Sequence, residues 1–230
     1  IISKNLNFIY LTFLLSAYPL SGWVADIDNF EIAFDYTPPA VAPTPVVFPE
    51  NQKGIVWEIG PDKSELKQIV GLENVVAVAV GDYFEAALKS DGTVWLWTQS
   101  NTTLHQVKGE NGQGFQTDVK KIIAGNNFGM ALKKDGTVWS WSQGFINPQN
   151  PINAGISGIV DIAAGAGHKL ALTSAGTVYG WGRNDRAQAG ANCDCPFISG
   201  PNLINNLSNV VSIAAGDSHS LVVKKGGSVW

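Results

Sequence analysis

Residues 159–179 read IVDIAAGAGHKLALTSAGTVY, and three other segments of the chain repeat this pattern without gaps. Successive copies start 44, 40 and 51 residues apart, and within every copy two glycines lie eleven residues apart. Repeats with a fixed interior and variable connections are typical of propellers and other repeat architectures. The other copies are VVAVAVGDYFEAALKSDGTVW (75–95), VKKIIAGNNFGMALKKDGTVW (119–139) and VVSIAAGDSHSLVVKKGGSVW (210–230), and the glycine pairs are Gly81 and Gly92, Gly125 and Gly136, Gly165 and Gly176, and Gly216 and Gly227.

Each copy predicts two strands joined by a tight turn, followed by the start of a third strand. The first strand ends in small residues such as Ala163 and Ala164, which suit an innermost strand where neighbouring sheets converge on an axis. The second strand alternates with the period of two that strands require, as at His168, Leu170 and Leu172. The second glycine of each copy predicts a hairpin turn with a positive φ angle.

Aromatic residues recur at alternate positions of each third strand, whereas a helix would place residues two apart on different faces. We expect these rings to fill the space between adjacent twisted sheets, because each ring buries a large apolar area there. An apolar return follows each third strand, as at residues 66–70, and predicts a fourth, outer strand. The aromatic residues are Trp95 and Trp97, Trp139 and Trp141, and Tyr179 and Trp181.

The fold predicted from these patterns is all-β: a β-propeller of four-stranded antiparallel blades. Gly54–Trp57 match the third-strand start of one more unit. Because the chain stops at Trp230 inside a third strand, we expect an incomplete arc of about four blades plus part of another, a fragment whose remaining blades are missing. The units are expected at about 54–72, 73–118, 119–158, 159–208 and 209–230.

Two segments precede these repeats, which occupy residues 53–230. Residues 1–25 contain a short apolar run after Lys4 and then small residues, which is typical of an export signal; a buried first strand or an uncleaved anchor is the alternative. The run is shorter than the roughly 20 residues that span a bilayer, so we expect no membrane span in the mature chain. Residues 26–52 carry five prolines and predict an extended spacer. We therefore expect an exported protein, in the periplasm, on the cell surface or secreted.

Charge and motif content exclude several classes of function. The chain has thirteen lysines, two arginines and 19 acidic residues, without the clustered basic groups that phosphate neutralisation needs, so no nucleic-acid partner is expected. It lacks a Gly-x-Ser-x-Gly elbow, a His-Glu-x-x-His motif, a phosphate-binding loop and a dinucleotide fingerprint. We expect no catalytic, cofactor-binding or metal-binding residues and no cofactor. A carboxylate pair of the glycosidase type cannot be recognised in sequence and stays open.

The repeats resemble the regulator of chromosome condensation repeat family, whose units carry Ile-Ala-Ala-Gly-x-x-His-Ser-Leu-Ala-Leu followed by Asp-Gly-x-Val-Trp-x-Trp-Gly. The best matches are IAAGAGHKLAL (162–172) with GTVYGWG (176–182), and IAAGDSHSLVV (213–223), and the resemblance covers residues 54–230. It implies a propeller, most often of seven blades. The founding member is a nuclear nucleotide-exchange factor for a small GTPase, and others are regulatory scaffolds, photoreceptors or secreted inhibitors. Phe84 and Phe128 replace the family histidine and basic arms are lacking, so a bacterial-type exported member is expected rather than a chromatin-bound exchange factor.

The first turn of each copy is the candidate partner-binding rim. Structural turns could all be alike, whereas these turns differ from copy to copy, as a recognition surface should. They supply the candidate binding residues Asp82, Tyr83, Asn126, Asn127, Asp217 and Ser218, together with Ala166-Gly167.

His168 and His219 occupy equivalent positions just after a first turn. They could form a ligand-facing pair, or each ring could bond a neighbouring loop as a structural residue. Because phenylalanine fills the same position in two copies, the structural interpretation is favoured.

Cys193 and Cys195 lie in the longest connection. An oxidising compartment favours a disulfide between them, although so small a ring would be strained. Two free thiols, or part of a soft metal site, are the alternatives, and a zinc site would need more ligands than these two.

The function expected is a non-catalytic scaffold that binds an unidentified protein partner through its rim loops. The first alternative is a guanine-nucleotide exchange or regulatory factor for a small GTPase, which rests on the resemblance alone. The second is a carbohydrate-binding or carbohydrate-active propeller, which exposed aromatic residues and a close carboxylate pair would favour.

Overall fold

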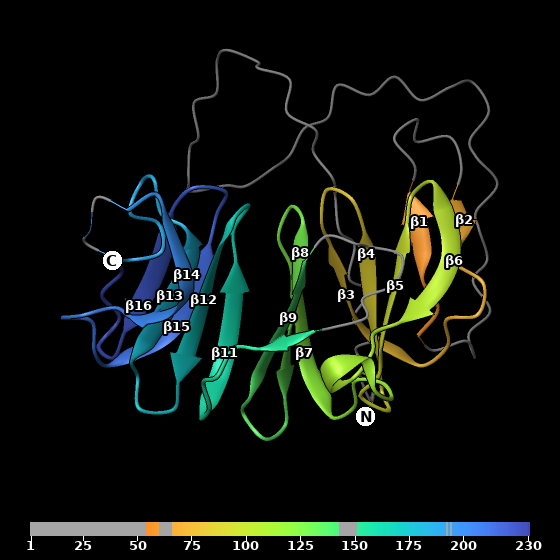
Figure 1. Cartoon of the computed structure of the whole chain (residues 1–230), viewed down its shortest axis with the longest axis horizontal. Coiled ribbons are helices and arrows are strands. Elements are labelled where there is room, and N and C mark those ends of the chain that lie inside the picture. The colour runs from red at the N-terminus through yellow and green to blue at the C-terminus, as the bar shows by residue number, and fades with distance from the viewer. Residues whose placement is uncertain (1–53, 60–65, 143–150, 192, 194) are drawn as a thin grey trace, which may run out of the picture. The chain divides into compact units, whose positions relative to one another are not determined.

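The alternating segments of each repeat form antiparallel strands joined by short turns (Figure 1). The computed structural model describes residues 54–59, 66–142, 151–191, 193 and 195–230, all within the compact unit Phe48–Trp230. The expected signal at 1–25 and spacer at 26–52 lie outside the described residues. The strands are β1 (Trp57–Ile59), β2 (Leu66–Gln68), β3 (Val75–Val80), β4 (Glu85–Lys89), β5 (Val94–Thr98), β6 (Asn101–Gln106), β7 (Val119–Ala124), β8 (Phe128–Lys133), β9 (Val138–Ser142), β10 (Ile152–Asn153), β11 (Ile159–Ala164), β12 (His168–Thr173), β13 (Val178–Arg183), β14 (Phe197–Leu203), β15 (Val210–Ala215) and β16 (Ser220–Lys224), with one 3-10 turn, η1 (Glu110–Gly112).

Within each sheet, strands that follow one another in the chain pair with each other, and the sheets follow one another along the chain. Blade 2 has the order β3-β4-β5-β6, blade 3 β7-β8-β9-β10 and blade 4 β11-β12-β13-β14. Blade 1 consists of the pair β1-β2 and blade 5 of the pair β15-β16. The all-β prediction and the expected outer strands are confirmed, and the blades form an open arc (Figure 1).

Backbone hydrogen bonds join successive blades at both ends of their inner strands. The carbonyl of a hairpin glycine accepts from the first residue of the next inner strand, as Gly92 O does from Val119 N at 3.2 Å. The same bond recurs from Gly136 O to Ile159 N at 3.1 Å. At the opposite end the first turns are bonded to one another, beginning with Asp82 N and Asn126 O at 3.1 Å. The spacing between blades is therefore set by the backbone as well as by side-chain packing.

The hydrophobic core lies between the blades. Trp141 of blade 3 packs with Phe84 and Leu96 of blade 2, and Trp181 of blade 4 packs with Phe128 and Met130 of blade 3. Trp97 meets Val56, Ile69 and Leu72 of blade 1 in the same way. The prediction that the repeated rings fill the space between adjacent sheets is confirmed at these three boundaries.

The hairpin glycines have the positive φ angle that the sequence predicts, with φ of 82° at both Gly92 and Gly136. The turn is longer than the two residues Asp91-Gly92, because Lys89 N donates to Thr93 O and Gly92 N donates to Lys89 O. Asp91 keeps an ordinary negative φ and its carboxylate accepts from Thr93 N at 2.9 Å. The positive φ is thus confined to the glycine, as in three-residue hairpin loops.

Candidate functional site

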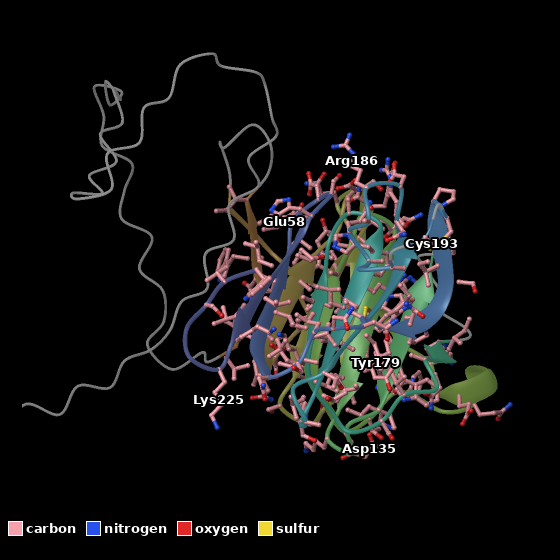
Figure 2. The ribbon with its side chains drawn as sticks, turned by 90° about the vertical axis from the view of Figure 1, so that its left-hand side faces the viewer. Glu58, Asp135, Tyr179, Arg186, Cys193 and Lys225 are labelled. Carbon is pink, nitrogen blue, oxygen red and sulfur yellow. A yellow bond between two sulfur atoms is a disulfide. The ribbon has the colours of Figure 1, made fainter. Side chains whose placement is uncertain are left out.

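The first turns lie together at one end of the sheets. Because successive strands run in opposite directions, the connections from third to fourth strands reach the same end, and the hairpin glycines lie at the other. Figure 2 shows this separation: Arg186, from the connection after β13, lies at one end of the sheets, and Asp135 and Lys225, from hairpin turns, lie at the other. The first turns form the first-turn rim, which consists of residues 82–83, 126–127, 166–167 and 217–218.

The backbone of the first-turn rim is fixed while its side chains vary. Asp82 N donates to Asn126 O, Asn126 N donates to Ala166 O at 3.0 Å, and Ala166 N donates to Asp217 O at 3.3 Å. The second residue of each turn takes no part in these three interblade bonds. Tyr83 is 59% exposed, Asn127 is also exposed, and Ser218 is half-buried. The rim therefore presents different polar groups from a preorganised row of turns.

Directly after the rim, one ring per repeat covers the glycine that ends the inner strand. A Cβ on Gly125 would lie 2.2 Å from the Phe128 ring, and a Cβ on Gly165 would lie 2.3 Å from the His168 ring. Phenylalanine and histidine thus have the same packing role, which explains how both can occupy this position.

The ring positions also meet the next blade, and each boundary uses a different chemistry. At the boundary between blades 3 and 4, Lys169 Nζ lies 3.7 Å from the centre of the Phe128 ring, a cation–π contact. Burial lowers the pKa of Lys169 to about 8. At the boundary between blades 4 and 5, His168 Nε2 and Ser220 Oγ are hydrogen-bonded at 2.9 Å. Lys169 and Ser220 occupy equivalent positions in their repeats. The same position of the repeat therefore supplies a cation at one boundary and a hydroxyl at the next.

His168 and His219 do not form a ligand-facing pair. His168 is fully buried and bonded to Ser220, whereas His219 lies exposed on blade 5. Burial lowers the pKa of His168, and the charges of His219 and Lys169 lower it further. The geometry gives His168 a structural contact with the next blade, made to a strand rather than to a loop.

Glu58 in β1 of blade 1 and Glu85 in β4 of blade 2 interact electrostatically, and the sequence patterns did not predict this carboxylate pair. Glu85 is only 9% exposed, and its pKa is raised to about 7, chiefly by burial and then by the charge of Glu58. Among the described residues, one oxygen of each carboxylate and the Trp97 indole N–H are buried without a hydrogen-bond partner. Glu85 occupies the same position in its repeat as Lys169 and Ser220 do in theirs. A charged residue at this otherwise variable position was the sequence feature that could have indicated the pair. The burial of Glu85 and the charge of Glu58 both favour the protonated form of Glu85.

The connection from β13 to β14 is organised around the buried side chain of Asn184. Its amide nitrogen donates to Ala191 O at 3.2 Å and to Cys195 O at 3.1 Å, and its amide oxygen accepts from Ala189 N at 3.2 Å. Cys193 and Cys195 are joined by a disulfide. Gln188 O in this connection accepts from Ser220 Oγ at 2.7 Å, which links the connection to the His168 contact.

Neither a metal-binding cluster nor a membrane-spanning helix is present among the residues that the structure describes. No three His, Cys, Asp or Glu side chains of those residues gather in a group that could hold a metal ion. None of the helical segments among them is long and apolar enough to cross a membrane.

Comparison with known proteins identifies the repeats. Two models of the regulator of chromosome condensation (RCC1) repeat match this chain, one over residues 159–188 and the other over residues 175–223. Residues 159–223 of the chain therefore contain RCC1 repeats. The expected resemblance is therefore confirmed, and it rests on the copies with the best motif match.

The curated relatives of this RCC1-repeat protein are much longer than the matched segments. Protein pim1 of Schizosaccharomyces pombe is 28% identical over 176 residues, which are 71% of this chain and 28% of pim1. The regulator of chromosome condensation of Drosophila melanogaster is 40% identical over 78 residues, 34% of this chain and 14% of that protein. A mouse protein described as the probable E3 ubiquitin-protein ligase HERC4 is 38% identical over 74 residues, 31% of this chain and 7% of the ligase. The chain spans less than a third of each of these relatives.

Solved structures show the fold of these RCC1 repeats. Yeast RCC1 (Prp20) bound to Kap60 has a TM-score of 0.58 and 23% identity, covering 71% of this chain and 45% of that chain. Prp20p from Saccharomyces cerevisiae, described with its binding properties to Gsp1p and histones, has a TM-score of 0.59 and 22% identity, covering 71% and 47%. At these identities the likeness shows the fold alone, an incomplete β-propeller of the RCC1 type. Those relatives are described with protein partners, namely Kap60 in the first structure, and Gsp1p and histones in the second.

Proposed function

We propose that this RCC1-repeat propeller is an exported, non-catalytic scaffold that binds a protein partner through the first-turn rim. One observation carries the proposal: the backbone of neighbouring turns is bonded from blade to blade, while the side chains that the turns present differ. A rigid row of loops loses little conformational entropy on binding, which favours affinity. Side-chain variety along the row supplies specificity.

Tyr83 and Asn127 are the best-placed recognition side chains on this rim. Both are exposed, and both stand at the second position of a turn, next to a residue whose backbone is fixed by an interblade bond. Tyrosine combines a large apolar face with a hydroxyl, and tyrosine is enriched in protein interfaces for that reason. Asn127 adds an amide that can donate and accept.

The proposal is tested with the full chain immobilised as bait and the double variant Tyr83→Ala with Asn127→Ala beside it. Proteins retained by the wild-type chain are identified by mass spectrometry, and the affinity of each is measured with purified components. We expect the double variant to weaken binding about tenfold or more, as for exposed anchors at the centre of an interface. Unchanged affinity would exclude this rim as the binding surface.

A matched control comes from the opposite end of the sheets. Ser90 and Lys134 lie in hairpin turns at that end. Both are exposed, as Tyr83 and Asn127 are on the rim. The double variant Ser90→Ala with Lys134→Ala is expected to bind as the wild type does. Export is tested separately, by locating the chain after fractionation of a host that expresses the entire reading frame.

Nucleotide exchange on a small GTPase is the alternative that the relatives suggest. Its test is the release of labelled guanine nucleotide from a GTPase, with and without the chain. Acceleration of release would replace the scaffold proposal. The carbohydrate alternative gains no support from the pair formed by Glu58 and Glu85, because Glu85 is buried between blades instead of facing an open surface.

A further inference from the structure

The connection from β13 to β14 is held in place without help from its disulfide. Asn184 N donates to Pro196 O at 2.7 Å, and its side chain bonds Ala191 O and Cys195 O. A second set of bonds fixes its tip, where Gln188 Oε1 accepts from Arg186 N at 2.8 Å. Asn184 and Gln188 are each only 3% exposed. Buried amides with several partners are costly to displace, so they keep the connection folded.

The disulfide itself closes a very small ring. Cys193 and Cys195 are separated by two positions in sequence, with 5.2 Å between their Cα atoms. The stabilisation that a disulfide derives from restricting the unfolded chain is smallest for the shortest loops. Cys193 is exposed and Cys195 is half-buried. The bond therefore adds little to the stability of the fold and is open to reagents.

We propose that the Cys193–Cys195 disulfide is a reversible thiol–disulfide exchange site for small-molecule thiols of the glutathione class. Exposed disulfides that contribute little to folding are the ones that exchange readily with thiols. This inference rests on the geometry of the connection and does not depend on the proposed function.

The exchange proceeds by two displacements at sulfur. The thiolate of one external thiol attacks Cys193 Sγ; a new S–S bond forms, the protein S–S bond breaks, and its electron pair goes to Cys195 Sγ, which takes a proton. A second external thiolate attacks the external sulfur of the mixed disulfide. The bond to Cys193 Sγ breaks, and Cys193 leaves with the electron pair and takes a proton. Two external thiols are oxidised to their disulfide, and the protein disulfide is reduced to two thiols. The reverse sequence restores the protein disulfide.

Exposure makes Cys193 the attacked sulfur. It is the more exposed of the pair, and access governs which sulfur a thiolate reaches. Cys195, which leaves as the thiolate, is partly covered, and its backbone carbonyl accepts from the Asn184 amide.

The test uses the native full chain in buffers of reduced and oxidised glutathione. Samples are quenched in acid, alkylated and weighed by mass spectrometry, while tryptophan fluorescence and thermal unfolding report on the fold. We expect full conversion between disulfide and dithiol without denaturant and without a change in the melting temperature. A disulfide that yields only after denaturant is added, or a dithiol that does not close with oxidised glutathione, would overturn the proposal. A melting temperature that falls on reduction would show a structural role instead.

Single variants test which sulfur reacts. With oxidised glutathione, Cys195→Ser is expected to form a mixed disulfide at Cys193 about tenfold faster than Cys193→Ser forms one at Cys195. Here the protein thiolate attacks oxidised glutathione, which is the reverse of disulfide opening and passes through the same mixed disulfide. Equal rates would therefore contradict the assignment of Cys193 as the attacked sulfur. The double variant Cys193→Ser with Cys195→Ser, which should melt as the wild type does, is the unreactive control.

Discussion

His168 Nε2 lies 2.9 Å from Ser220 Oγ across the boundary between blades 4 and 5, and this contact fixes the protonation of the histidine. Ser220 Oγ donates its only proton to Gln188 O at 2.7 Å. It must therefore accept from His168, so Nε2 carries the proton. The pKa of His168 is lowered by burial, which favours the neutral ring with this tautomer.

The first prediction concerns this contact. His168→Phe keeps the ring volume over Gly165 and loses the hydrogen bond, so we expect a loss of about 1 kcal/mol in the free energy of unfolding. His168→Ala also leaves a cavity and should cost about 3 kcal/mol. Urea unfolding followed by fluorescence measures both. His219→Ala, at the equivalent but exposed position, should change the free energy of unfolding little. A loss as large as that of His168→Ala would show that burial does not account for the cost of removing the His168 ring.

The second prediction is a pH dependence that arises from Glu85. Its pKa is about 7 in the folded chain against 4.5 for an ordinary glutamate. Between these values the unfolded chain has released a proton that the folded chain retains, so the contribution of Glu85 to stability falls as the pH rises from 4.5 to 7 and is constant above.

Glu85→Gln removes this titration. We expect the variant to be more stable than the wild type above pH 7, by on the order of 1 kcal/mol after allowance for solvent screening, with the difference fading toward acid. Urea midpoints across the pH range provide the measurement. Glu110→Gln, on an exposed side chain, is the control and should follow the wild-type profile. A difference between Glu85→Gln and wild type that does not vary with pH would refute the assignment.

The third prediction tests the rings between blades. The Trp141 ring lies against Gly129, where an added Cβ would be 2.3 Å from it, and only 4% of this side chain is exposed. Trp141→Ala should lower the free energy of unfolding by about 3 to 5 kcal/mol through a cavity between blades 2 and 3. Trp230 is 68% exposed, and Trp230→Ala should cost far less. Similar losses in the two variants would argue against interblade packing as the source of stability.

The fourth prediction concerns the hairpin glycines. Gly92 has a φ of 82°, and an added Cβ would meet Asp118 N of the next blade at 2.9 Å. Gly92→Ala should therefore destabilise the fold by about 1 to 2 kcal/mol, because alanine is strained at positive φ and its methyl group presses on the interblade contact. Gly200 in β14 has no atom within 4 Å of such a Cβ, so Gly200→Ala should be nearly neutral. Calorimetric melting curves compare the two, and equal shifts would contradict this explanation.

Local sequence was enough to predict the blades, because each strand pairs with its neighbours in sequence. The alternation at Leu170 and Leu172, the hairpin turn at Gly92 and the small residues that end each inner strand are local signals. The packing of Trp141 between blades could be predicted because an aromatic ring recurs at the same position of successive repeats, as Trp97 and Trp181 do. A ring that recurs once per blade is expected to fill the same gap between neighbouring sheets each time.

Only the tertiary structure decided which residues meet across the blade boundaries. Glu58 and Glu85 lie in different repeats, and so do Phe128 and Lys169, and no spacing in the sequence pairs them. His168 and Phe128 look different in sequence, yet both cover a glycine, and the residue on the next blade determines which chemistry is used. The reason is physical: strand periodicity is a property of neighbouring residues, whereas burial and a shifted pKa depend on what the next sheet places opposite.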